Sequence, residues 1–63
     1  MAVPEWVVRA LERHTQGKVV SVKDNLITVD LDFAWYTYEV VRVDETNAVL
    51  KMPDIGETLE LHK

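Results

Sequence analysis

Apolar and polar residues alternate through much of this chain, which is the pattern of β-strands that bury one face. Residues 18–32, KVVSVKDNLITVDLD, read as two short strands joined by the two-residue turn Asp24-Asn25. Both turn residues tolerate the positive φ that such a hairpin turn requires. This loop length predicts a register in which an apolar face pairs Val22 with Ile27, Val20 with Val29 and Lys18 with Leu31, and a polar face pairs Ser21 with Thr28.

The segment before this hairpin has the spacing of a helix over about residues 4–16. Pro4 suits the first helical position, because no backbone N–H is needed there, and Gly17 is a natural stop. Glu5 is well placed at the positive end of the helix dipole and pairs with Arg9 four residues later. The inward stripe consists of Val3, Val7, Ala10, Leu11 and His14.

The second half of the chain predicts three more strands. Phe33-Ala34-Trp35 breaks the alternation, so a loop, bulge or bend is expected there. Residues 44–47 form a four-residue turn, and Pro53 ends a strand because it has no N–H to donate. The expected register pairs Val43 with Ala48 and Val41 with Leu50 on one face, and Arg42 with Val49 and Val40 with Lys51 on the other.

These elements predict one small domain, residues 1–63, of the mainly β (α+β) class. An N-terminal helix is followed by a curled five-stranded antiparallel sheet or a small barrel, since a curled sheet buries one face and hides its edges. The strands are expected at about residues 18–23, 26–32, 36–43, 48–52 and 58–62.

The order of a helix and five short strands is similar to that of the Sm and Hfq-like small barrels. Residues 40–52, VVRVDETNAVLKM, resemble their strand, Asp, Asn, strand signature, with Asp44 and Asn47 near the matching places. The glycine of the bent strand and a second motif with an Arg-Gly or Lys-His pair are absent. Residues 17–31 resemble an SH3-like barrel equally well. The Sm-like resemblance implies a ring oligomer that binds RNA, but it carries over no binding residue because those motifs are missing.

Composition limits how this chain can be stabilised. A 63-residue chain that is 48% hydrophobic cannot hide all of its apolar surface from water. The chain has no cysteine, which removes disulfides and thiolate metal sites, so oligomerisation is the remaining supplement to the core. Some apolar surface is therefore expected to meet a partner.

Charge is unevenly distributed around a formal net charge of −4. Residues 1–23 carry four basic and two acidic side chains, whereas residues 24–63 carry three basic and nine acidic ones. The sequence contains no apolar run of the roughly 18 to 20 residues that a membrane span needs, and its start lacks a signal-peptide pattern. These features predict a cytoplasmic protein without membrane contact.

The residues needed for catalysis form no motif here. The chain has no cysteine and a single serine, Ser21, while His14 and His62 lack neighbours that resemble a nucleophile, metal or phosphate motif. Asp30 and Asp32 have the spacing of a solvated strand face rather than that of a cation site. The sequence therefore predicts no catalytic residue, no metal, no cofactor and no enzyme activity.

Aromatic and basic residues alternate along the strand at 36–43 and its neighbour. If Val41 faces the core, then Tyr36, Tyr38, Arg42 and Lys51 share the opposite face. Such a surface stacks bases and holds phosphates in proteins that bind single-stranded nucleic acid. The negative net charge argues against this function, because phosphate neutralisation supplies most sequence-independent affinity.

Two functions remain open from the sequence. The preferred hypothesis is a non-enzymatic interaction module that self-associates or binds a protein partner through Trp35, Tyr36 and Tyr38. The alternative is a small β-barrel of Sm-like or SH3-like type that binds RNA or single-stranded nucleic acid. It would use the tyrosines together with Arg42 and Lys51.

Overall fold

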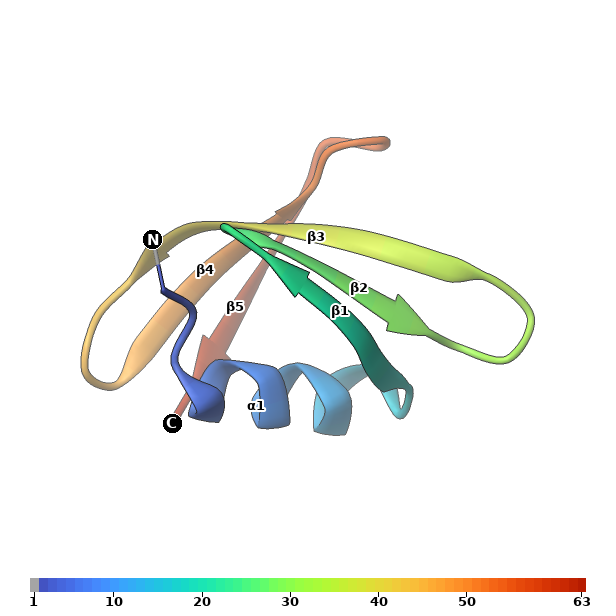
Figure 1. Ribbon diagram of the computed structural model, residues 1–63. Coiled ribbons are helices and arrows are strands. Elements are labelled where there is room, and N and C mark those ends of the chain that lie inside the picture. The colour runs from blue at the N-terminus through green and yellow to red at the C-terminus, as the bar shows by residue number, and fades with distance from the viewer. Residues whose placement is uncertain (1) are drawn as a thin grey trace.

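One helix packs against the concave side of a five-stranded antiparallel sheet in the computed structural model, which describes residues 2–63 (Figure 1). The elements are α1 (Glu5–Thr15), β1 (Lys18–Lys23), β2 (Leu26–Asp30), β3 (Trp35–Val43), β4 (Asn47–Met52) and β5 (Glu57–His62). Each strand pairs with the next one along the chain, in the order β1-β2-β3-β4-β5. The predicted fold class is confirmed, and each predicted element ends within two residues of the observed one.

The sheet is curled but not closed. Strands β1 and β5 lie at its two edges, so the open sheet is formed and not the small barrel. Helix α1 contacts both edge strands and lies beneath the sheet between them (Figure 1). The Glu12 side chain accepts a hydrogen bond from the backbone N–H of Val19 at 2.9 Å, which occupies a donor of the β1 edge.

The ends of α1 follow the local sequence closely. Pro4 is the N-cap and not the first helical residue as expected, because its ψ of 148° is extended; its carbonyl accepts a hydrogen bond from Val7. Gln16, in the left-handed conformation, ends the helix just before Gly17. The expected pair between Glu5 and Arg9 is confirmed, with 2.7 Å between Arg9 Nη2 and Glu5 Oε1.

The core lies between α1 and the concave face of the sheet. Its buried residues from the helix are Val7, Ala10 and Leu11, and those from the sheet are Ile27, Val29, Tyr38, Val40, Ala48, Leu50 and Leu61. His14, expected on the inward stripe of the helix, is exposed at the end of α1.

A β-bulge at Val20 changes the register of the first hairpin. The turn at Asp24-Asn25 is confirmed, as are the pairs Val22–Ile27 and Ser21–Thr28. Beyond the bulge, Val19 and not Val20 faces Val29, and Lys18 faces Asp30 instead of Leu31. The extra residue shifts the rest of β1 by one position, because two residues of β1 there oppose one residue of β2.

A second bulge, at Val41, divides β3. The pairs Val43–Ala48 and Arg42–Val49 are confirmed. The expected pairs of Val41 with Leu50 and of Val40 with Lys51 are wrong, because the extra residue makes Val40 face Leu50 and Glu39 face Lys51. Val40 is consequently 1% exposed and Val41 is 53% exposed.

Candidate functional site

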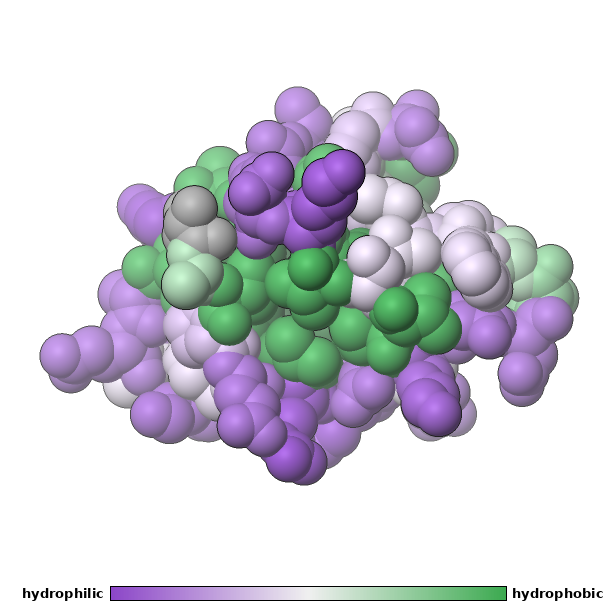
Figure 2. All heavy atoms as spheres, in the orientation of Figure 1, coloured by the Kyte–Doolittle hydropathy of each residue, from purple (hydrophilic) through white to green (hydrophobic). Residues whose placement is uncertain are grey.

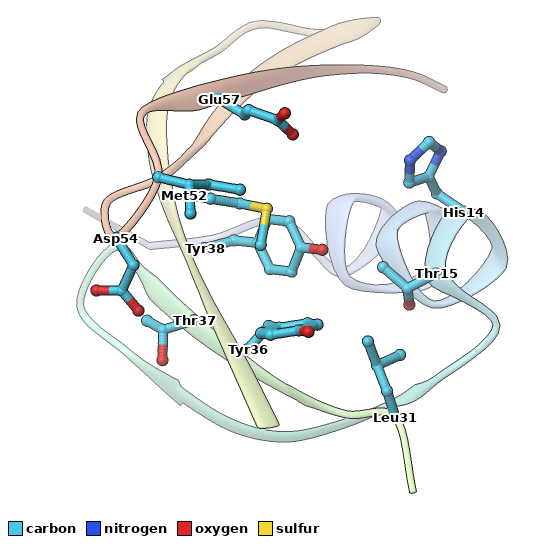
Figure 3. A pocket seen from close by; sticks show the side chains of 10 residues that line it. His14, Thr15, Leu31, Tyr36, Thr37, Tyr38, Met52, Asp54 and Glu57 are labelled. Atoms are coloured by element: carbon cyan, nitrogen blue, oxygen red, sulfur yellow. The ribbon is translucent and has the colours of Figure 1, made fainter. Parts of the chain in front are cut away.

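A cleft of about 440 Å³ opens on the concave side of the sheet, beside the C-terminal end of α1 (Figure 3). Side chains from the helix, from three strands and from two connections surround it. The residues that line the cleft are His14, Thr15, Leu31, Tyr36, Thr37, Tyr38, Met52, Asp54, Ile55 and Glu57. Its volume falls within the range of about 300 to 1,000 Å³ that is usual for ligand pockets.

Tyr36 and Tyr38 project into this cleft because of the bulge at Val41. The bulge leaves Val40 on the core face, and alternation then puts both tyrosines on that same face. Figure 3 shows both rings directed into the opening, with Met52 next to Tyr38. Tyr38 is 6% exposed; its burial raises the pKa of the phenol, and the neighbouring Tyr36 raises it further.

The loop between β2 and β3 adds an aromatic side chain at the mouth of the cleft. Asp32 has a φ of 73° and donates its backbone N–H to Asp30 Oδ1, so this loop turns sharply. The two aspartates thus serve the turn. Phe33, 79% exposed, meets the Tyr36 ring edge to face with the ring centroids 6.4 Å apart.

The turn between β4 and β5 forms the opposite side of the mouth. Gly56, with a φ of 72°, and Ile55 both donate backbone N–H groups to the Met52 carbonyl. This tight turn leaves Ile55 60% exposed. We call Phe33, Tyr36 and Ile55 together the apolar rim.

The structure separates the residues that the sequence had grouped. Tyr36 and Tyr38 lie on the concave face, whereas Arg42 and Lys51 lie on the convex face, as does the exposed Trp35. The expectation that the tyrosines share a face with Arg42 and Lys51 is therefore wrong. The cause is the bulge at Val41. Its extra residue puts the even-numbered residues before it on the concave face and leaves Arg42, after it, on the convex face.

Several residues that line the cleft were not among the site residues predicted from the sequence. His14 was expected on the inward stripe of the helix, but it is exposed and lies at the edge of the cleft. Asp54 and Ile55 follow Pro53 in a turn and Glu57 begins β5, and no sequence motif marks these three residues. Met52 lies on the concave face with Leu50, yet its contact with the cleft depends on where the helix ends.

The convex face carries basic and acidic side chains in alternation. Lys18 lies opposite Asp30, and Lys51 lies opposite Glu39 in the strand pairing. Arg42 lines a small hollow together with Asp44 and Glu60. Hydrogen bonds from the backbone N–H groups of Thr46 and Asn47 hold the pKa of Asp44 below its ordinary value.

Neither a metal centre nor a membrane-spanning helix is found in the part of the chain that the structure describes. Within residues 2–63, no three histidine, aspartate or glutamate side chains are grouped so that they could hold a metal ion. The helix in this range is neither long nor apolar enough to cross a membrane.

The fold and the cleft together define a protein of the α+β class, in which one helix partly covers an open five-stranded meander. Comparisons with protein-family models, with curated proteins and with solved structures found no match to this chain.

Proposed function

We propose that this chain is a non-enzymatic interaction module that binds an exposed segment of a protein partner in the cleft. The observation that carries the proposal is the apolar rim, in which Phe33 and Ile55 are largely exposed. Ile55 lines the cleft together with Tyr38 and Met52, and Phe33 packs on Tyr36, which lines it as well. Burying apolar surface contributes about 25 cal/mol per Å². A partner segment that covers the rim and enters the cleft would gain this energy.

The aromatic side chains of the apolar rim are already ordered, which also favours the binding of a partner segment. Tyr36 is held on β3 by its pairing with Val29 of β2, and Phe33 packs on its ring from a loop that hydrogen-bonds to itself. Aromatic side chains that are already ordered lose little conformational entropy when a partner covers them. Clusters of this kind are typical hot spots of protein interfaces.

A selection from a displayed peptide library tests the proposal. We expect peptides to be enriched on the wild-type chain and their binding to be lost with Phe33→Ala or Tyr36→Ala. Leu26→Ala is the matched control, because Leu26 is an exposed apolar residue of β2 on the convex face. Peptides that bind all of these variants equally, or no enrichment at all, would contradict the proposal.

Self-association is a second candidate, favoured by a different surface. Figure 2 shows apolar side chains gathered in the middle of the viewed face, where α1 and β1 lie in Figure 1. Val20 and Val22 of the edge strand β1 are exposed, and Val8 of α1 is half-buried. An edge strand with apolar neighbours can pair with a second copy of itself.

Sedimentation across a concentration series tests self-association. The expected result is an oligomer that persists in high salt and dissociates with Val22→Lys, since a lysine on an edge strand opposes further pairing. A wild-type monomer at every concentration would restrict the function to binding other proteins.

Binding of RNA or single-stranded DNA has less support from the structure than from the sequence, which had placed the tyrosines and the basic residues on one face. Arg42 and Lys51 lie apart from the tyrosines, and Lys51 lies opposite a carboxylate residue, Glu39. Titration with both nucleic acids at about 50 mM salt is the appropriate test, because phosphate contacts strengthen as salt is lowered. We expect no salt-sensitive binding.

A further inference from the structure

Apart from the imidazole of His14, the ionisable side chains of the cleft are two carboxylates and two tyrosines. Asp54 and Glu57 line it from the side of the β4–β5 turn, and none of the ten described lining residues is a lysine or an arginine. The C-terminal end of α1 borders the cleft through His14 and Thr15, and this end of a helix carries a partial negative charge. The cleft therefore attracts a positive charge.

Aromatic faces accompany these negative groups. Figure 3 shows the ring of Tyr36 nearly edge-on and that of Tyr38 nearly face-on, so the two rings present differently oriented faces to the cleft. The same view shows the Glu57 carboxylate at the mouth, across from the His14 imidazole. A cation that lies on an aromatic face and near a carboxylate is stabilised by both.

The shape of the cleft suits a long side chain. The cleft is open to solvent, has a volume of about 440 Å³, and is floored by the apolar Met52 and by Tyr38. An aliphatic stem can pack on such a floor while its charged end reaches a carboxylate. The backbone that carries this side chain would then lie across the apolar rim.

We propose that the cleft binds a basic side chain, arginine in preference to lysine, presented by an exposed segment of a partner protein. This inference rests on the proposed function and names the chemistry of its partner. A planar guanidinium stacks on tyrosine and can bond a carboxylate with two N–H groups, whereas an ammonium group offers only a point charge. Glu57 is the carboxylate at the mouth, and Tyr36 is the more accessible ring.

Titration of the ¹⁵N-labelled chain with short blocked peptides tests this inference. The probes are Ala-Arg-Ala, Ala-Lys-Ala and Ala-citrulline-Ala, since citrulline keeps the shape of arginine without its charge. We expect the arginine peptide to move the amide signals of Thr15, Tyr36 and Ile55. The citrulline peptide should bind about three- to tenfold more weakly, the size of effect expected for a partly exposed charge contact.

Two glutamates of β5 provide a matched pair of variants. Glu57→Gln removes a charge from the cleft, whereas Glu60→Gln removes one from the convex face of the same strand. The arginine peptide should lose about two- to fivefold in affinity with Glu57→Gln and keep its affinity with Glu60→Gln. Circular dichroism of each variant checks that the fold is retained.

The outcomes separate this inference from the proposed function. Equal affinity for the arginine and citrulline peptides, or equal effects of the two glutamate variants, would overturn the inference. If library peptides without arginine or lysine bind and are lost with Tyr36→Ala, the proposed function stands while the inference fails. If neither the library nor the arginine peptide yields binding at the cleft, both fail.

Discussion

Gly17 shows how a single residue lets α1 rejoin the sheet. It lies in the connection between α1 and β1, where a Cβ atom would come within 2.7 Å of the Asp30 carbonyl oxygen and 2.8 Å of Val29 Cγ1. Real Cβ atoms do not approach backbone this closely, so glycine is required there for space and not for its φ angle. This close approach brings the end of the helix next to the cleft.

Replacing Gly17 with alanine should therefore destabilise the chain. We expect a loss of about 1–3 kcal/mol in the free energy of unfolding, which is typical of overpacking. Gly56→Ala is the comparison: Gly56 has a φ of 72° but open space around it, so its cost should be nearer about 1 kcal/mol. Urea unfolding of both variants measures this, and a smaller loss at Gly17 than at Gly56 would contradict the account.

Asp44 gives the stability of the fold a dependence on pH. Its side chain accepts hydrogen bonds from the backbone N–H groups of Thr46 and Asn47 at 2.9 and 2.8 Å, and these lower its pKa in the folded chain. A lowered folded pKa means that the ionised group stabilises the fold above the unfolded pKa of about 4. This contribution is lost as the pH falls through the folded pKa.

Asp44→Asn should consequently be less stable than the wild type near neutral pH. The difference in unfolding free energy between them should be constant above about pH 5 and shrink as the pH falls through the unfolded and then the folded pKa of Asp44, because protonation removes the wild-type advantage. Glu45→Gln is the control, since it removes a neighbouring charge but keeps the acceptor of the turn. A difference that stays constant with pH would show that the ionisation of Asp44 is not responsible.

At the scale of elements, the two bulges decide which side chains meet. Each bulge adds one residue to a strand, and the side chains on its two sides then follow different alternations. In β3, this brings Tyr36 and Tyr38 to the concave face together with Val40, while Arg42 remains on the convex face. The cleft thus depends on Val41 although Val41 does not line it.

The bulge in β3 predicts opposite outcomes for two neighbouring valines. Val40→Ala should cost about 2 kcal/mol, because it removes two buried methyl groups and leaves a cavity. Val41→Ala should change the unfolding free energy by at most about 0.5 kcal/mol, as is usual at exposed positions. Chemical unfolding of both variants measures the difference. A larger cost at Val41 than at Val40 would contradict the bulge and indicate that Val41 faces the core.

Local sequence patterns predict the order of the helix and strands, but they do not predict which face of the sheet each side chain lies on. The helix from Glu5 to Thr15 and the turn at Asp24-Asn25 could be predicted because spacing and turn residues mark them locally. The bulges at Val20 and Val41 could not, because each lies in a run of valines that reads as strand in either register. The candidate site was therefore predicted only as separate residues: Tyr36 and Tyr38 reach a cleft, and Arg42 and Lys51 do not.

At the scale of the whole molecule, one helix covers only part of a curled sheet. Helix α1 bridges the edge strands and buries the middle of the concave face, but it ends at Thr15, before it covers Tyr36 (Figure 1). The uncovered end becomes the cleft, with the apolar rim around it. The same arrangement that leaves the sheet open thus leaves uncovered the surface at which we propose that a partner binds.

Mapping the bound surface in solution tests this account most directly. The measurement is the change in the ¹H–¹⁵N signals of the labelled chain as a library-selected peptide is added. We expect changes centred on Thr15, Tyr36 and Ile55, with the signals of Arg42 and Lys51 unchanged. Changes centred on the convex face, or on β1 and the outward side of α1, would contradict it.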